Sequence, residues 1–391
     1  MHHRLLSAAL SLTLVACTMT GGEDASSTSS GGGGGSTSGG ASSGGGSSGS
    51  GSGSGSTSST SSGGSSSSAE PTQSVISGRV LAPSGTFGLF DALVSVDYTD
   101  EDGVERHKQT HTRFDGQFFL RGLPPGTYTV KAERGRYTGT GAATIDDPLS
   151  QVTGVDIRVL AAGARFVVVT GSYDSIEDII GTGSGGLGFN PVIVDGSQDW
   201  GADPPNAPWV DEVATPEYLA NVDALFLNCG LGDDIFSNPN LADRRQALLD
   251  WIAAGGGLYA SDWAYDVVEW LFPDPITFLG DDLIHGDAQQ GDSEIVTATM
   301  VDETLEKIVG RTVEINYDLP AWAVIEEATT SNTVSVLATG TVHAGVRELE
   351  EVPLAVRIRS GEGTVIYTTF HNEVQLDETV RGILNYIVMS L

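Results

Sequence analysis

A long tract of small residues divides this chain and confines its folded part to the C-terminal side of the tract. From 26 to 68 every residue is Gly, Ser or Thr except Ala41. Such a composition has almost no apolar surface to offset the entropy lost on folding. We therefore expect residues 17–71 to be a disordered tether, with folded structure from residue 72 onward. As a flexible coil the tract spans roughly 35 to 40 Å, which suits a spacer.

The N-terminal segment has the features of an export signal. Arg4 precedes an apolar run over residues 5–16, which is too short to span a bilayer. The run ends in Leu14-Val15-Ala16-Cys17, which resembles the lipobox of bacterial lipoproteins. The resemblance implies that residues 1–16 are a signal peptide and that Cys17 receives a lipid after cleavage. An ordinary signal peptide with a chance cysteine is the alternative.

The residue after Cys17 bears on where such a lipoprotein would go. Thr18 stands where Asp would retain a bacterial lipoprotein at the inner membrane. The resemblance therefore implies an exported protein, lipid-anchored at the outer membrane or cell surface, without indicating which face. Cys229 is the only other cysteine, so the mature chain has no pair for a disulfide between folded parts.

The charge of the chain is strongly negative and unevenly distributed. The net charge is −32, and residues 165–391 hold 37 acidic and 9 basic residues, a net −28. An acidic surface of this kind repels phosphates. We expect no nucleic-acid partner, and the charge indicates no oligomeric state.

Residues 72–160 have the pattern of a small β-sandwich. Short β-prone runs at 74–80, 92–98, 117–120 and 128–132 are separated by Gly, Pro and Asp turns. Four motifs occur in order: Gly78-Arg79-Val80, Asp91-Ala92-Leu93-Val94, Phe114-Asp115-Gly116-Gln117-Phe118 and Gly122-Leu123-Pro124-Pro125-Gly126-Thr127-Tyr128. Together they resemble the carboxypeptidase regulatory-like domain. The resemblance implies a transthyretin-like sandwich in which Asp115-Gly116 is a hairpin turn and Phe118 and Tyr128 pack inside.

Residues 165–391 change to a pattern in which strands and helices alternate. Apolar strands are predicted at 166–170, 191–194, 224–228 and 258–260, with helices at 175–180, 216–220, 241–254 and 376–388. Alternation of this kind predicts an α/β domain with a mostly parallel sheet. Ligands of such sheets bind beyond the carboxyl ends of the strands, so candidate residues are sought there.

Three segments at predicted strand ends carry polar chemistry. Gly257-Leu258-Tyr259-Ala260-Ser261-Asp262-Trp263 is a strand that enters a helix, where a nucleophile elbow would lie. Thr369-Phe370-His371-Asn372-Glu373 comes after a late strand and supplies an imidazole and a carboxylate. Leu227-Asn228-Cys229-Gly230-Leu231-Gly232 leads from a strand into a flexible turn whose amides could face an oxyanion.

In this order the segments resemble the class I glutamine amidotransferase-like superfamily, including its trehalose-utilisation-like branch. The resemblance implies a flavodoxin-like fold over residues 165–391. It places Ser261 near the nucleophile, His371 on the general base and Glu373 on the group that orients it. Backbone amides of Gly230, Gly232 and Asp262 would form the oxyanion site.

The sequence departs from the amidotransferases at the nucleophile itself. Ala260-Ser261-Asp262 has neither their cysteine nor a flanking glycine, so glutamine hydrolysis is not expected. A serine hydrolase remains open if a base removes the Ser261 proton. The competing interpretation is structural, because a serine or Asp262 at this point often caps a helix.

Other candidates are weaker. Cys229 has nothing nearby in sequence to lower its pKa. Residues 280–287 collect carboxylates and one imidazole without the spacing of a calcium loop or zinc motif. Trp263, Tyr265, Trp270 and Phe272 could wall a pocket or pack in the core. We expect no cofactor and no metal.

These patterns indicate two functions. The first is a non-catalytic envelope lipoprotein whose domains bind a glycan or a protein. The second is a serine-type peptide or amide hydrolase that uses Ser261, His371 and Glu373. Convergence of these three side chains would favour the second, and the sequence names no ligand for the first.

Overall fold

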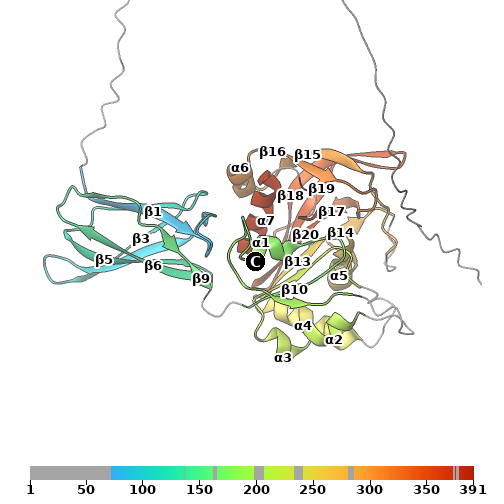
Figure 1. Ribbon diagram of the computed structural model, residues 1–391, viewed down its shortest axis with the longest axis horizontal. Coiled ribbons are helices and arrows are strands. Elements are labelled where there is room, and N and C mark those ends of the chain that lie inside the picture. Colours follow the sequence, from blue (N-terminus) through green and yellow to red (C-terminus); the bar gives the residue numbers. More distant parts are fainter. Residues whose placement is uncertain are drawn as a thin grey trace, which may run out of the picture. The chain divides into compact units, whose positions relative to one another are not determined.

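Figure 1 presents the protein as a computed structural model. The structure describes residues 72–135, 137–161, 165–197, 207–232, 241–280, 286–372, 375 and 378–391. The predicted signal peptide, Cys17 and the tether lie outside these residues, as do Glu373 and the acidic segment 281–285. Within the described ranges, no helix is long and apolar enough to cross a membrane.

Residues 72–161 form two β-sheets. One has the order β4-β1-β7, with β8 also paired to β1, and the other has the order β3-β2-β5-β6-β9. The strands are β1 Val75–Leu81, β2 Leu93–Thr99, β3 Glu105–His111, β4 Gln117–Arg121, β5 Gly126–Arg134, β6 Tyr137–Ile145, β7 Gln151–Val152, β8 Ile157–Arg158 and β9 Leu160–Ala161. The four strands expected from sequence are confirmed as β1, β2, β4 and β5.

The sandwich core is built by side chains that alternate along these strands. Val94 and Val96 from one sheet and Ile76, Phe118 and Leu120 from the other are buried in one cluster. Alternate residues of a strand point to opposite faces, so each sheet turns one apolar face inward. The expected burial of Phe118 and Tyr128 is confirmed.

A turn is present at Asp115-Gly116, but it is not the hairpin expected from sequence, because the strands it joins, β3 and β4, belong to different sheets and pair with β2 and β1. The Gly116 amide donates to the Arg113 carbonyl at 2.9 Å, and Gly116 has a φ of 81°. A β-carbon at Gly116 would lie 2.5 Å from the Val80 carbonyl oxygen. The turn therefore requires glycine for both its conformation and its close approach to β1.

The second folded part, residues 165–391, contains a nine-stranded sheet with the order β11-β10-β12-β13-β20-β19-β18-β15-β16. The strands from β11 to β20 are parallel to their neighbours, and those from β20 to β16 are antiparallel. Its strands are β10 Phe166–Val169, β11 Val192–Val194, β12 Ala224–Leu227, β13 Gly257–Ser261, β15 Glu294–Met300, β16 Thr312–Tyr317, β18 Val334–Ala344, β19 Arg347–Ser360 and β20 Gly363–Thr368. A separate two-stranded sheet pairs β14 Ile276–Phe278 with β17 Ile325–Ala328.

This mixed sheet corrects the expectation of a mostly parallel one. Residues 294–360 supply four long strands that return antiparallel, so parallel and antiparallel pairings are equal in number in the nine-stranded sheet. The four strands predicted between residues 166 and 260 are confirmed as β10, β11, β12 and β13. β10, β12 and β13 are continuous apolar runs that are fully buried, as is typical of central parallel strands, whereas β11 at the sheet edge leaves Val192 and Ile193 exposed.

Helices cover both faces of the parallel half (Figure 1). They are α1 Ile176–Ile180, α2 Pro208–Val213, α3 Pro216–Leu219, α4 Ala242–Ala253, α5 Tyr265–Leu271 and α7 Glu378–Ser390, while α6 Glu303–Val309 lies against β15 and β16 of the antiparallel half. Phe166, Phe226 and Tyr259 pack with the face that α1 and α7 cover. Val167, Leu225 and Leu258, one position away along the same strands, pack with the face covered by α2 to α5.

Candidate functional site

Four parallel strands end at the same edge of the sheet, and a polar side chain comes soon after each of them. Asp174 follows β10, Cys229 follows β12, Asp262 follows β13 and His371 follows β20. Because these strands are neighbours and parallel, segments separated by nearly 200 residues meet here. This is the edge where ligands of α/β sheets bind.

Asp262 occupies a sharp turn between strand and helix. Its φ is 48°, whereas Ser261 before it is extended with φ −116° and ψ 137°. A left-handed conformation is uncommon outside glycine, and Asp and Asn adopt it more readily than most residues. Asp91 and Glu351 share this conformation, with φ of 55° and 52°, so Asp262 is distinguished by having it at the edge of the sheet where the parallel strands end.

The residue at the pocket is therefore one position beyond the nucleophile expected from sequence. Ser261 is the last residue of β13 and is fully buried, and its Oγ donates to Asp174 Oδ2 at 2.7 Å and accepts from the Cys229 amide at 3.0 Å. Among the described residues no hydrogen bond joins Ser261 to His371. Asp262 lines the pocket and Ser261 does not.

Asp174, which was not predicted from the sequence, holds several segments together. Its Oδ1 accepts from the amides of Ser175 at 2.7 Å and Asn372 at 3.0 Å, while Oδ2 accepts from Ser261. These bonds fix the segment that carries His371 relative to β13. The only sequence signal for Asp174 was its position after β10, at the same edge as the other strand ends.

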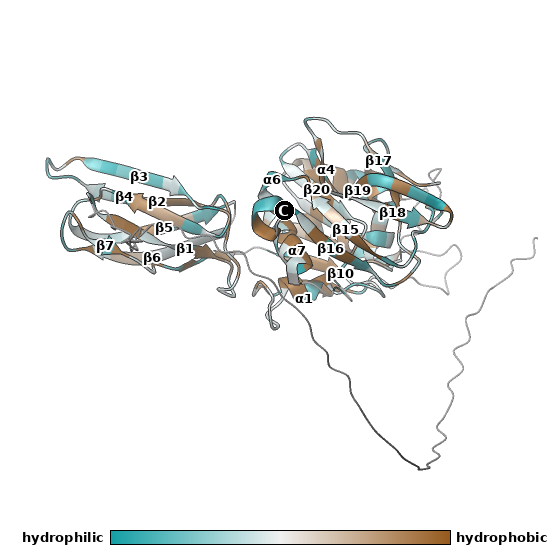
Figure 2. Ribbon diagram, turned by 90° about the horizontal axis from the view of Figure 1, so that it is seen from above, coloured by the Kyte–Doolittle hydropathy of each residue, from teal (hydrophilic) through white to brown (hydrophobic). Residues whose placement is uncertain are grey.

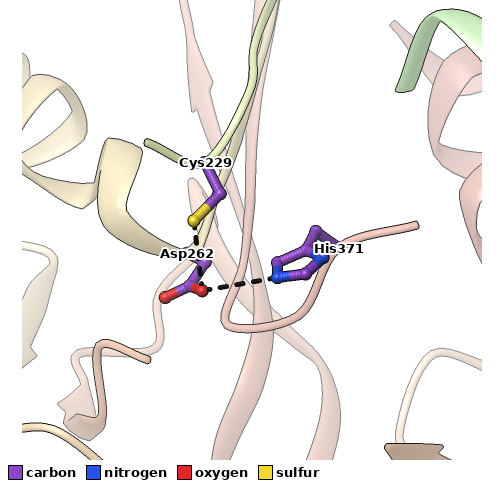
Figure 3. A group of neighbouring side chains, drawn as sticks. All are labelled: Cys229, Asp262 and His371. Carbon is purple, nitrogen blue, oxygen red and sulfur yellow. Dashed lines mark hydrogen bonds and ion pairs between the residues drawn. The ribbon is translucent and has the colours of Figure 1, made fainter. Parts of the chain in front are cut away.

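Asp262 lies between a thiol and an imidazole (Figure 3). Its Oδ2 accepts from the Cys229 thiol at 3.3 Å and lies 3.7 Å from His371 Nε2. Its Oδ1 accepts from the Ala323 amide at 2.9 Å. The sequence expectation that His371 belongs to the site agrees with this geometry, but its neighbour is Asp262.

Burial changes the protonation of these groups. It raises the pKa of Asp262 to about 8, opposed by hydrogen bonds from Ala323 and Cys229 and assisted by the charge of Asp174. Burial also raises the pKa of Asp174 and of the Cys229 thiol. The Asp262 carboxyl is therefore largely neutral at pH 7, and the Cys229 thiol keeps its proton and is a poor nucleophile.

A pocket of about 260 Å³ opens onto these side chains. Asp262, Cys229 and His371 contribute to its polar part, together with Asn316, Asp318 and Gln375. Its walls are aromatic: Trp322 stacks on Tyr317 with ring centroids 4.1 Å apart, and Trp263 donates through Nε1 to the Ala321 carbonyl. Trp263 thus lines the pocket as the sequence allowed, whereas Tyr265 is fully buried in the core.

One nitrogen of His371 is buried without a hydrogen-bond partner among the described residues. This nitrogen is Nδ1, and the His371 side chain is 15% exposed. Glu373, the expected orienting group, lies outside the described residues. The expected triad is thus represented in the described structure by His371 and Ser261, and no hydrogen bond joins these two side chains.

The backbone of the predicted oxyanion segment is engaged in structural contacts. The Gly232 amide donates to the Gly196 carbonyl at 2.7 Å, and the Gly232 carbonyl accepts from Trp209 Nε1 at 2.6 Å. Gly230 has a φ of 78° and lies against the ring of Tyr173, where a β-carbon would come within 2.6 Å of Cδ2. The Gly232 amide is therefore not directed to a ligand, and Asp262 contributes its side chain to the pocket.

Comparison with known proteins identifies the first folded part. Residues 75–160 match the family model of the carboxypeptidase regulatory-like domain. The match confirms the resemblance that the four ordered motifs indicated. No match to this chain was found among curated proteins.

Several solved structures are similar to part of the chain. A cytoplasmic protein from Salmonella typhimurium has 14% identity and a TM-score of 0.34 over 58% of this chain and 98% of its own. A putative ThuA-like protein from Parabacteroides merdae has 13% identity and a TM-score of 0.36 over 57% of this chain and 88% of its own. PurLQS from Thermotoga maritima has 12% identity and a TM-score of 0.35 over 58% of this chain and 98% of that chain.

Proposed function

We propose that this protein is an exported, lipid-anchored lipoprotein whose α/β domain, of amidotransferase-like fold, binds a neutral sugar unit of a glycan. The observation that carries the proposal is the pocket at the carboxyl edge of the parallel strands, where aromatic walls surround a polar floor. Binding, without a chemical step by Ser261, is the role that this pocket supports best.

The size and walls of the pocket suit a single sugar ring. Its volume, about 260 Å³, lies below the roughly 300 to 1,000 Å³ usual for drug-sized ligands. A sugar ring has apolar C–H faces and a rim of hydroxyl groups. Trp263, which is partly exposed, offers apolar aromatic surface, while Asp262, Asn316 and Gln375 supply hydrogen-bonding groups.

The rim of the pocket offers contact surface that is free to meet a ligand. Tyr173 is 52% exposed and Leu319 is 50% exposed, and both line the pocket. A protein rarely leaves large apolar side chains clustered at the mouth of a pocket without a contact to make. We assign these two residues to the outer contact with the glycan.

Charge selects the kind of sugar. No lysine or arginine lines the described part of the pocket, whereas Asp262 and Asp318 do. The surrounding domain is also strongly acidic, with a net −28 over residues 165–391. Acidic and phosphorylated sugars would be repelled, so a neutral glycan fits best.

A glycan array with neutral, sialylated and uronic glycans, probed with the full chain and followed by calorimetric titration, tests this role. We expect binding to neutral glycans. Tyr173→Ala should weaken it roughly 3- to 10-fold, because an aromatic contact is worth about 1 kcal/mol. Phe114→Ala is the matched control, since Phe114 is exposed and lies in the sandwich. Absence of neutral-glycan binding, or equal affinity of Tyr173→Ala and wild type, would refute the proposal.

The membrane anchor is a separate part of the proposal. It rests on the lipobox-like segment that ends at Cys17 and on the long tether behind it. In a bacterial host, Cys17→Ser should move the protein from the membrane fraction to the soluble fraction and abolish labelling by an alkyne-tagged fatty acid. Membrane association of Cys17→Ser equal to that of wild type would exclude the lipid as the anchor. Ser36→Ala, in the tether, is the control.

A further inference from the structure

The structure holds three potential metal ligands at the floor of the pocket. Cys229, Asp262 and His371 each offer one ligand atom, and the three atoms lie within 4.8 Å of one another. They follow β12, β13 and β20, so the sheet itself brings them together. No short sequence motif contains them, which is why a metal was not expected from the sequence.

We propose that Cys229 Sγ, Asp262 Oδ2 and His371 Nε2 form a three-ligand zinc site whose fourth coordination position opens on the pocket. A thiolate, an imidazole and a carboxylate are the ligands that zinc takes in proteins. A three-ligand set with an open position is typical of zinc sites that receive a water molecule or a ligand oxygen. The proposal does not depend on glycan binding.

Two of the three separations between ligand atoms are close to those of zinc coordination, and all three lie within 4.8 Å. Oδ2 of Asp262 lies 3.3 Å from Cys229 Sγ and 3.7 Å from His371 Nε2. Tetrahedral zinc, with bonds of about 2.0 to 2.3 Å, separates its ligand atoms by about 3.3 to 3.6 Å. The separation from Nε2 is longer than a hydrogen bond, so the carboxylate and imidazole already stand at a separation that one ion can bridge.

The groups around the three ligands are compatible with a bound cation. Oδ1 of Asp262 is engaged by the Ala323 amide, which leaves Oδ2 directed to the other two ligands. Neither lysine nor arginine is present in the described lining to neutralise a carboxylate or thiolate. Zinc would supply this charge, and the protons of the Cys229 thiol and of the Asp262 carboxyl would pass to solvent as the zinc–sulfur and zinc–oxygen bonds form.

The pocket also makes the site open to solvent. All three ligand residues line it, and the exposed Tyr173 and Leu319 line it as well. An ion at this floor is therefore reachable from solvent, and an oxygen of a ligand in the pocket can take the fourth position. This arrangement distinguishes the site from a closed structural zinc site, in which four protein ligands surround the metal.

Zinc content, measured by mass spectrometry after zinc loading and gel filtration of the full chain, tests the proposal. We expect about one tightly held zinc per chain. Cys229→Ser, Asp262→Asn and His371→Gln should each lose the zinc. We expect each to lower the zinc affinity by more than the roughly 10- to 100-fold that follows when a hydrogen bond to a metal ligand is removed. His343→Gln is the matched control, because His343 is exposed and pairs with Glu294 on β15.

A second measurement keeps the test independent of how well the variants fold. Cobalt substituted into the wild-type chain should show sulfur-to-cobalt charge-transfer absorption, since Cys229 is the only cysteine of the folded part. Cobalt bound in the wild type with this band, together with loss of zinc in Cys229→Ser, supports the site. A wild-type chain that holds no stoichiometric zinc, cobalt bound without the band, or zinc retained by all three variants would overturn it.

Discussion

The two folded parts of this protein differ in what they bury. In the sandwich the buried polar side chains are hydroxyls, as at Thr112, whose Oγ1 accepts from the Ala92 amide and donates to the Leu89 carbonyl. The α/β domain buries carboxyl groups, among them Asp174 and Asp262. Burying an ionisable group is costly, whereas a hydroxyl that is fully hydrogen-bonded is easily accommodated.

This difference indicates which part carries chemistry. The buried hydroxyls of the sandwich join neighbouring backbone segments, as expected of a structural module. In the α/β domain Asp174 and Asp262 lie at strand ends, Asp262 lines a pocket, and burial raises the pKa of both carboxyls. Displaced pKa values that occur beside a pocket are typical of functional sites.

The largest expected change in stability tests whether burial of apolar side chains alone stabilises the sandwich. Phe118→Ala removes a core ring that is 1% exposed, and we expect a loss of about 3 to 5 kcal/mol in the free energy of unfolding. Urea unfolding monitored by circular dichroism measures it. Phe114→Ala, at an exposed ring of the preceding turn, should change stability by less than about 0.5 kcal/mol. Equal losses in the two variants would contradict the assigned core.

The second prediction concerns how much the buried Asp262 carboxyl lowers the free energy of unfolding of the α/β domain. In metal-free protein, the folded-state pKa of Asp262 is about 8 and the ordinary value is 3.8. The unfolded chain therefore releases this proton first, and wild-type stability should fall as pH rises from about 4 to about 8, then level off. Asp262→Asn should remove the part of this fall that Asp262 causes, leaving the part due to Asp174, and gain about 2 to 4 kcal/mol at pH 8.

Thermal and urea unfolding from pH 4 to 9, with a chelator present, measures this dependence. Asparagine suits the comparison because it tolerates the left-handed turn and can still accept from the Ala323 amide. Asp318→Asn, at an exposed carboxyl of the same pocket, is the control and should leave the curve unchanged. Parallel stability curves for wild type and Asp262→Asn would contradict the raised pKa.

The smallest expected change in stability distinguishes a structural role of Ser261 from a nucleophilic one. Ser261→Ala leaves Asp174 Oδ2 and the Cys229 amide short of a buried partner, so stability should fall by about 1 to 3 kcal/mol. A fluorophosphonate probe should label wild type and Ser261→Ala equally weakly. Strong labelling of wild type that disappears in Ser261→Ala would restore the hydrolase hypothesis.

The parts of the fold that the sequence predicted are those with strong local patterns. Apolar runs such as those of β10 and β12 identified the parallel strands. β3 was missed because its residues, Glu105–His111, are all polar, and Figure 2 shows the strand as largely hydrophilic. It is the edge strand of its sheet, where neither face needs an apolar pattern.

The sequence predicted where in the fold the candidate site lies, but not which residues form it. The rule that strand ends converge identified the segments of Ser261, His371 and Cys229 correctly. It could not decide between Ser261 and Asp262, because the choice depends on where the strand ends and which side each residue faces, and a shift of one residue reverses that side. Asp174 and the stack of Tyr317 on Trp322 arise from pairings between distant segments, for which one sequence carries no local pattern.

The left-handed turn at Asp262 also limits how this site can be redesigned. For most side chains that backbone conformation costs roughly 1 to 2 kcal/mol, and glycine, asparagine and aspartate are the exceptions. Installing the thiol of an amidotransferase by Asp262→Cys would therefore combine backbone strain with a second sulfur beside Cys229. A designer who wants new reactivity at this edge of the sheet does better to keep residue 262 and vary His371 or the pocket walls.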